Sequence, residues 1–217
     1  AAILKQQREF WRLAWGMRLS DFIAYLVSNT QLRKVTFKLP HRRETRYVWG
    51  KVSRYNLAVS MKTGGYLSHY AAVAIHDLTD QVPKTLYVNH EQRPQPPPPD
   101  GLTQERIDAA FRRPQRMTTN CTDYEGFRYC YVNGKHTARL GVVELADELG
   151  DPVPVTGLER TLIDIAVRPE YAGGIPEVLE AYGRAHEHLS LNRLAATLSN
   201  MNYVYPYEQA VGFLLER

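Results

Sequence analysis

The stretch TGLERTLIDIAVRPEYAGGIPEVLEAYGRAHEHL, residues 156–189, contains two helical patterns on either side of a short break. Thr156, followed three residues later by Glu159, forms a capping box, which is a sequence sign of a helix start. Apolar residues then recur at the spacing of one helix face, which predicts a helix over 157–167 with a buried stripe. A second apolar stripe predicts another helix over 174–188.

The break between the two helices reads RPEYAGG. Pro169 ends the first helix, because the residue before a proline avoids the α conformation. Gly173 and Gly174 have no Cβ atom, so the next helix can approach closely. We interpret the break as a joint that sets the angle between two packed helices. A catalytic or ligand-binding loop is the alternative interpretation.

Helix and strand patterns alternate along the rest of the chain, which predicts a mixed α+β fold. Before residue 156 we expect a helix at 66–78 capped by Ser68, a strand at 84–90, a proline-rich linker at 92–101, a helix at 102–113, a hairpin pair at 116–136 and a strand within 140–149. Helices at 190–201 and from Pro206 follow. Together these elements predict an α/β domain over 65–217 with a mixed sheet and C-terminal helices.

The first 64 residues have a different pattern. The expected elements are a basic amphipathic helix at 4–19, a helix at 20–29, a hairpin at 33–50 and a helix at 53–65. Phe10 and Trp11 are expected on the inner side of the first helix. This order is compatible with a winged-helix-like module over 1–64.

Charge is distributed unevenly along the 217 residues. Residues 1–62 hold 13 Lys and Arg against 3 Asp and Glu, a net charge of +10. Residues 63–217 hold 14 against 20, a net charge of −6, and the two sum to the total of +4. A basic first part indicates a polyanionic partner. No run of about 18 apolar residues occurs, so we expect a cytoplasmic protein without a membrane span.

The hairpin is the strongest candidate for a binding site. Its basic residues are Arg33, Lys34, Lys38, Arg42, Arg43, Arg46, Lys51 and Arg54. Tyr47, Trp49 and Tyr55 are interleaved with them. On DNA, guanidinium groups at a hairpin tip would contact phosphates or enter the minor groove, while a neighbouring helix would read the major groove. A solvated surface, or a patch that docks on an acidic protein, is the alternative.

The chain lacks the motifs of several enzyme classes. No glycine-rich phosphate loop, GxSxG or HExxH occurs. A metal-dependent nuclease would need an acid near a Glu-x-Lys to hold Mg²⁺, and neither Glu-x-Lys nor Asp-x-Lys is present. We therefore expect no catalytic residues, no metal and no cofactor.

The histidines and cysteines also suggest structural roles. His69 and His76 lie seven residues apart, and no further metal ligands converge on them in the sequence. We expect His69 to support a helix start and His76 to end that helix. Cys121 and Cys130 fit no zinc spacing, so we expect two reduced thiols on the arms of one hairpin.

Glu159, Arg160, Thr161 and Asp164 are polar residues on the otherwise apolar helix at 157–167, and Arg168 follows it. Arg160 and Asp164 are i,i+4 partners and can form an ion pair. Thr161 lies between them, and Arg168 can bond to the last carbonyls of the helix. We interpret the group as a capped helix with a half-buried ion pair. An anion-binding or catalytic cluster is the alternative.

Three segments resemble the AbiEi-type antitoxin family. GYLSHYAAVAIHDLTDQVPKTLYVN (65–89) is similar to its YLSH–HGLT–P–YV block, and TGLERTLIDIAVRPEYAGGIPEVLEAY (156–182) to its ERTLIDI–RP–YAGG signature. YPYEQAVGFLLER (205–217) resembles a later family segment. The motif residues carried over are Ser68, His69, His76, Arg160, Thr161, Asp164, Arg168, Gly173 and Gly174.

The resemblance implies the antitoxin half of a type IV toxin–antitoxin system that acts in abortive infection and phage defence. It implies a winged helix that binds inverted repeats in its own promoter as a transcriptional repressor. The second domain would neutralise a nucleotidyltransferase-like toxin, commonly without a stable complex. Asp77 stands where the family often has glycine, and family sequences normally continue beyond residue 217. A nuclease-like enzyme and a module that docks directly on an acidic protein are the competing interpretations.

Overall fold

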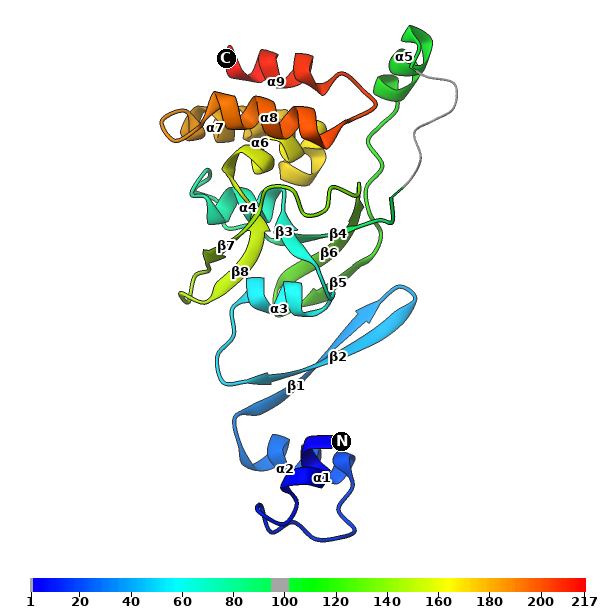
Figure 1. Cartoon of the computed structure of the whole chain (residues 1–217), viewed down its shortest axis with the longest axis vertical. Coiled ribbons are helices and arrows are strands. Elements are labelled where there is room, and N and C mark those ends of the chain that lie inside the picture. The colour runs from blue at the N-terminus through cyan, green and yellow to red at the C-terminus, as the bar shows by residue number, and fades with distance from the viewer. Residues whose placement is uncertain (1, 95–101) are drawn as a thin grey trace.

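The computed structural model describes residues 2–94 and 102–217. It confirms a mixed α+β fold, with a two-stranded sheet, a six-stranded mixed sheet and several helices. Figure 1 shows an elongated molecule in which the first helices lie at one end, the hairpin and the large sheet in the middle, and α6–α9 at the other end. Of the proline-rich segment expected at 92–101, residues 95–101 lie outside the described part.

The large sheet has the strand order β5-β6-β4-β3-β8-β7. Its strands are β3 (Tyr66–Ser68), β4 (Thr85–Glu91), β5 (Cys121–Tyr124), β6 (Phe127–Gly134), β7 (Val142–Ala146) and β8 (Pro152–Thr156). The pairs β4–β6 and β3–β8 are parallel, and the other neighbouring pairs are antiparallel. Strands far apart in the sequence therefore lie side by side, which brings together residues from distant segments.

Helices cover the sheet on the side away from the N-terminus (Figure 1). They are α4 (Tyr70–Ile75), α6 (Leu158–Val167), α7 (Ile175–Ala185), α8 (Leu191–Met201) and α9 (Tyr207–Leu215), while α5 (Gln104–Arg112) lies to one side. Leu162, Ile163 and Val178 are fully buried in their shared core. The four C-terminal helices expected from the sequence are confirmed. Their apolar residues recur at the helical spacing, so each helix buries one face in this core.

The RPEYAGG break is the expected joint between α6 and α7. Pro169–Ala172 form a short 3₁₀ helix, and Gly173 ends it in the left-handed conformation with φ +87°. Gly174 follows at φ +96°, which L side chains rarely adopt. A Cβ on Gly173 would also lie 2.8 Å from Cγ of Glu177. Both glycines are therefore required by the turn itself.

Two expected helix caps are wrong. Thr156 belongs to strand β8, and Gly157 is the N-cap of α6 without a side-chain cap bond. Ser68 belongs to β3, and His69 is the N-cap of α4. In both cases pairing within the sheet holds the polar residue in an extended strand, and its hydroxyl bonds to a side chain, Thr161 or His69, in place of a backbone N–H of the helix.

The helix expected at 4–19 is shorter than predicted. The structure has α1 (Ala2–Gln7), a series of turns, and α2 (Leu19–Asn29). The Arg8 guanidinium donates to the carbonyl oxygens of Ala14 at 2.5 Å and Met17 at 2.9 Å, which stabilises a folded-back loop in place of a helix. The expected inner positions of Phe10 and Trp11 are also wrong, since the two residues are 82% and 41% exposed.

The hairpin consists of β1 (Leu32–Leu39) and β2 (Arg42–Trp49), and α3 (Arg54–Ser60) follows. The expected order of helix, helix, hairpin and helix is therefore present. Phe37 of β1 packs edge-on against Tyr124 and Tyr129 of the large sheet, at ring distances of 5.4 and 5.7 Å. One hydrophobic cluster thus runs across residue 64. The division into 1–64 and 65–217 stays a prediction.

The two cysteines lie on facing strands of one hairpin, as expected. Cys121 of β5 is the register partner of Cys130 of β6, with the turn at Glu125 and Gly126. The expectation of reduced thiols is wrong, because the two form a disulfide with a Cα–Cα distance of 4.2 Å. Their direct cross-strand position brings the sulfur atoms together, and sequence spacing alone does not show this.

Candidate functional site

The hairpin has two chemically different faces. Residues that are directly opposite in its register lie on the same face, and each strand alternates between the faces. The inner face carries Val35, Phe37 and Val48, which are buried against the large sheet. The outer face points to solvent, and we define it by Lys34, Lys38, Arg43, Tyr47 and Trp49.

Four of the eight predicted DNA-binding residues have partners within the chain. Arg42 pairs with Glu44 at 2.6 Å, and Arg46 pairs with the same carboxylate at 2.7 Å. Arg33 lies 3.6 Å from Glu125, in an exposed pair that is weakly stabilising. These contacts occupy the inner edge of the hairpin.

Arg46 and Arg54 also anchor the hairpin region to its neighbours. Arg46 donates to the carbonyls of Ser60 and Met61 at the end of α3, at 2.8 and 2.9 Å. Arg54 pairs with Glu148 at 2.7 Å and lies over the Phe127 ring at 4.9 Å. Their charged groups therefore hold the hairpin region against the rest of the protein and are not free for a ligand alone.

The other four predicted cations have no hydrogen bond or ion pair among the described residues. They are Lys34, Lys38, Arg43 and Lys51, and all are exposed. Lys38 is the direct cross-strand partner of Arg43, an arrangement of like charges that destabilises a hairpin. Tyr47 and Trp49 share this face and are 45% and 59% exposed. A polyanion would relieve the repulsion, and the flat rings are available for stacking.

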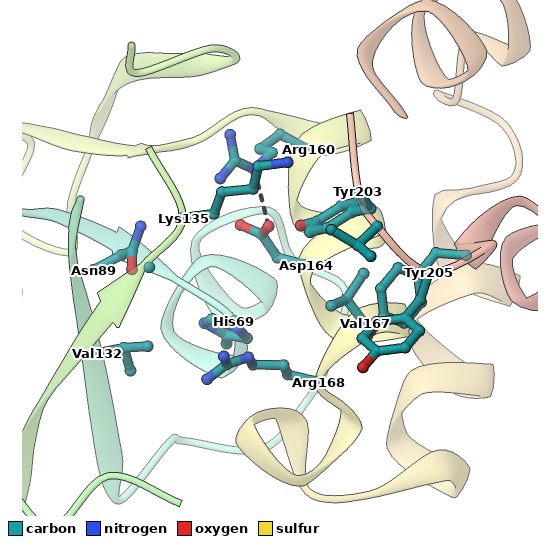
Figure 2. Close-up of a pocket in the computed structure, with 13 residues that line it drawn as sticks. His69, Asn89, Val132, Lys135, Arg160, Asp164, Val167, Arg168, Tyr203 and Tyr205 are labelled. Atoms are coloured by element: carbon teal, nitrogen blue, oxygen red, sulfur yellow. Dashed lines mark hydrogen bonds and ion pairs between the residues drawn. The ribbon is translucent and has the colours of Figure 1, made fainter. Parts of the chain in front are cut away.

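Four of the motif residues line one cavity of about 260 Å³ (Figure 2). They are His69, Arg160, Asp164 and Arg168. Asn89 and Val132 of the sheet form the opposite wall, and the segment 203–207 forms a third side. For the cluster around Arg160 and Asp164, the sequence allowed a structural or a functional role. The structure places three of its residues, Arg160, Asp164 and Arg168, in the lining of this cavity.

Arg160 and Asp164 form a buried ion pair in the wall of this cavity. Arg160 Nε donates to Asp164 Oδ1 at 2.9 Å, and the two residues are 4% and 6% exposed. Arg160 also donates to Thr137 Oγ1 at 3.2 Å and to the Leu140 carbonyl at 2.7 Å. Burial raises the pKa of Asp164 above its usual value, although Arg160 opposes this effect. The pair is more deeply buried than the half-buried pair expected.

His69 lies at the strained start of α4. Its φ of +52° and ψ of −131° are unusual for a residue with a side chain, and such strain is often found at functional sites. Burial, together with the positive charges of Arg168 and Arg160, lowers the pKa of His69 to about 3. The ring is therefore neutral near pH 7. Nδ1 bonds to the Ser68 hydroxyl at 2.9 Å.

The remaining motif residues lie outside the cavity lining. Thr161 Oγ1 bonds to the Thr156 hydroxyl at 2.8 Å, and His76 Nε2 lies 2.7 Å from the Thr156 carbonyl. His76 is the C-cap of α4, as expected. Gly173 and Gly174 form the α6–α7 joint. These residues fix the framework around the cavity.

Several cavity residues were not identified from the sequence. They are Asn89, Lys135, Tyr203, Tyr205 and Tyr207. Asn89 fits only because Gly134 has no side chain, since a Cβ there would overlap the Asn89 amide. The one available sequence signal was YVYPY, which has three tyrosines in five residues.

No metal centre or membrane span is found in the described part of the chain. Residues 2–94 and 102–217 contain no group of three or more His, Cys, Asp or Glu side chains that could hold a metal ion. None of the helices they form is long and apolar enough to cross a bilayer.

No protein-family model matches the chain, and no curated protein matches it.

Proposed function

We propose that this protein is an antitoxin and transcriptional autorepressor that binds promoter DNA through the outer face of its hairpin. The observation that supports DNA binding most strongly is the set of cations without intramolecular partners on this face. A positive stripe on the extended ribbon is formed by Lys38, by Arg43 directly opposite it, and by Lys34 four residues earlier on the same face. Phosphates would occupy this stripe, and binding would release counterions from the DNA.

The exposed aromatic residues favour a nucleic acid over an acidic protein as the partner. Tyr47 is the register partner of Lys34, and Trp49 follows on the same face. Interleaved cations and aromatic rings suit a backbone of phosphates and sugars with exposed base or ribose surfaces. Two-stranded ribbons also fit into DNA grooves. The inner face stays attached to the large sheet, so the stripe is held in a fixed orientation.

The antitoxin part of the proposal is supported by the sequence motifs. YLSH at 66–69 and ERTLIDI at 159–165 lie next to each other in the fold and contribute to one cavity. The partner proposed from the resemblance is a nucleotidyltransferase-like toxin. We also propose that the protein is cytoplasmic. Cytoplasmic thiols are kept reduced, so we expect the Cys121–Cys130 disulfide to be reducible there.

The test is a fluorescence anisotropy titration with the protein's own upstream promoter and a scrambled duplex. The variant Lys34→Gln/Lys38→Gln/Arg43→Gln removes the stripe, and Arg112→Gln/Arg113→Gln/Arg193→Gln removes the same charge from helices at the far end (Figure 1). We expect promoter-selective binding that the first variant loses and the second retains. Equal weak binding to both duplexes, or equal loss in both variants, would contradict the proposal.

The antitoxin activity is tested separately by co-expression with the product of the neighbouring gene. Growth should be restored by the wild-type chain and also by the stripe variant, because neutralisation is assigned to residues 65–217. If the toxin stays active in the presence of the wild-type chain, the antitoxin part of the proposal is contradicted. The DNA-binding part is not affected by that result. Stable, nuclease-resistant co-purification that depends on the stripe would favour direct docking on an acidic protein.

A further inference from the structure

The cavity beneath α6 has an unusual balance of charge. Among its lining residues, Lys135, Arg160 and Arg168 carry positive charge and Asp164 is the one acid. Asp164 is engaged by Arg160 at 2.9 Å. His69 is neutral near pH 7. The lining residues therefore sum to a formal charge of about +2, and the carboxylate of Glu91, outside the lining, also interacts electrostatically with Asp164.

Arg168 is the cation best placed to receive a ligand. Its guanidinium has no hydrogen bond or ion pair with any described residue, although its charge acts on His69 and Asp164, and it lies 5.7 Å from the Tyr171 ring. All five of its N–H donors are therefore available. The side chain is half-buried, so water solvates it less than a surface arginine. A planar guanidinium of this kind matches two oxygens of one oxyanion.

Lys135 supplies the second positive charge from another side of the cavity (Figure 2). Its ammonium donates to the carbonyl of Met201 at 2.8 Å and to that of Asn202, and it lies over the Tyr203 ring at 5.4 Å. An ammonium has three donors, so one remains. The two carbonyls fix the position of the charge without neutralising it.

The other walls suit the organic part of a small ligand. Tyr203 and Tyr205 present aromatic rings, Val132 presents an apolar surface, and Asn89 presents an amide (Figure 2). The volume of about 260 Å³ is slightly below the range of roughly 300–1,000 Å³ that holds drug-sized ligands. The cavity is therefore suited to a ligand larger than an ion and smaller than a dinucleotide.

We propose that this cavity binds a small phosphomonoester, with the phosphate on Arg168 and the organic part against the tyrosines. A phosphomonoester carries a charge of about −1.5 to −2 near pH 7, which matches the formal charge of the lining residues, whereas a single carboxylate carries −1. The His69 ring lies next to Arg168 in the cavity lining (Figure 2), and because Nδ1 bonds to Ser68, Nε2 is its remaining hydrogen-bonding group. This site is separate from the outer face of the hairpin and does not depend on DNA binding.

The first test measures the thermal unfolding of the full chain with ribose 5-phosphate, inorganic phosphate, ribose and acetate. Ribose 5-phosphate should raise the Tm in a saturable manner, and inorganic phosphate should raise it less. Ribose and acetate should have no effect. Equal effects of acetate and phosphate would overturn the selection of a dianion, and no effect of any phosphate compound would overturn the site.

Variants locate the binding site. Arg168→Gln should weaken ribose 5-phosphate binding by about tenfold or more, because one charge-assisted contact is lost, and Lys135→Gln should weaken it as well. Arg43→Gln, on the outer face of the hairpin, is the matched control and should bind the ester normally. Arg168→Gln should in turn bind DNA normally. Unchanged ester binding by Arg168→Gln would overturn the assignment.

A measurement on the wild-type chain avoids any effect of substitution on folding. Phenylglyoxal modifies accessible arginines, and mass spectrometry identifies the modified residues. Ribose 5-phosphate should protect Arg168 and leave Arg43 reactive. Equal modification of Arg168 with and without the ester would contradict the proposal.

Discussion

The buried ion pair between Arg160 and Asp164 gives the sharpest prediction about stability. In Asp164→Ala the guanidinium would keep its bonds to Thr137 and Leu140 but lose its counter-charge, in a position where it is 4% exposed. Removing one partner of a buried pair costs about 3–5 kcal/mol, because the remaining charge is left uncompensated. We therefore expect the free energy of unfolding to fall by about that amount.

Urea unfolding followed by circular dichroism measures this change. The variant Arg160→Met/Asp164→Leu removes both charges and should cost less than Asp164→Ala alone, since no buried charge remains. Asp164→Asn keeps the shape and one acceptor, so it should fall between the wild type and Asp164→Ala. A loss below about 1 kcal/mol for Asp164→Ala, or a double variant as unstable as the sum of the single variants, would refute the reasoning.

Three further predictions concern packing, pH and the disulfide. Gly134→Ala would force a methyl group into the Asn89 amide and should lower the free energy of unfolding by about 1–3 kcal/mol in urea. His69 has a folded pKa of about 3 against 6.5 when unfolded, so the unfolded chain binds the extra proton. Stability should therefore fall as pH decreases from 6.5 towards 3, by up to about 1.4 kcal/mol per pH unit, and unfolding of His69→Gln should lack this component. Reduction of Cys121–Cys130 should cost roughly 2–3 kcal/mol, measured by unfolding with and without dithiothreitol, and an unchanged midpoint would contradict it.

The sequence predicted the helical part of the fold well. The helices expected at 157–167, 174–188 and 190–201 agree closely with α6, α7 and α8, because a 3.6-residue apolar period is a strong local signal. The joint at Gly173–Gly174 was also predicted, since proline and glycine act through their own backbone geometry. The hairpin was predicted from its two-residue alternation of apolar and polar residues, and its basic residues are read directly from the sequence.

The sequence could not predict features that depend on partners distant in the chain. Thr156 looked like a helix cap, but pairing of β8 with its neighbours holds it in a strand. Arg33 and Arg54 are engaged by Glu125 and Glu148, which lie far along the chain, whereas the partner of Arg42 and Arg46, Glu44, is nearby. Local patterns do not contain this information.

The cavity is the clearest case of a site formed by topology. Asn89 of β4 and Lys135, directly after β6, come together because the two strands are parallel neighbours, although Lys135 lies 46 residues after Asn89 (135 − 89) in the sequence. Tyr203 arrives from the segment between α8 and α9. The tyrosines of YVYPY were the one sequence signal, and only the folded structure reveals that they and the sheet residues surround Arg168.

The salt dependence of DNA affinity, compared between the wild type and the Lys34→Gln/Lys38→Gln/Arg43→Gln variant, decides whether the outer face of the hairpin contacts phosphates. Each phosphate contact contributes a slope of about −0.9 to log K against log salt concentration, so the loss of three contacts should flatten the slope by about 2.7. The Arg112→Gln/Arg113→Gln/Arg193→Gln control should keep the wild-type slope. Equal slopes for the wild type and the hairpin variant would show that the outer face does not contact DNA.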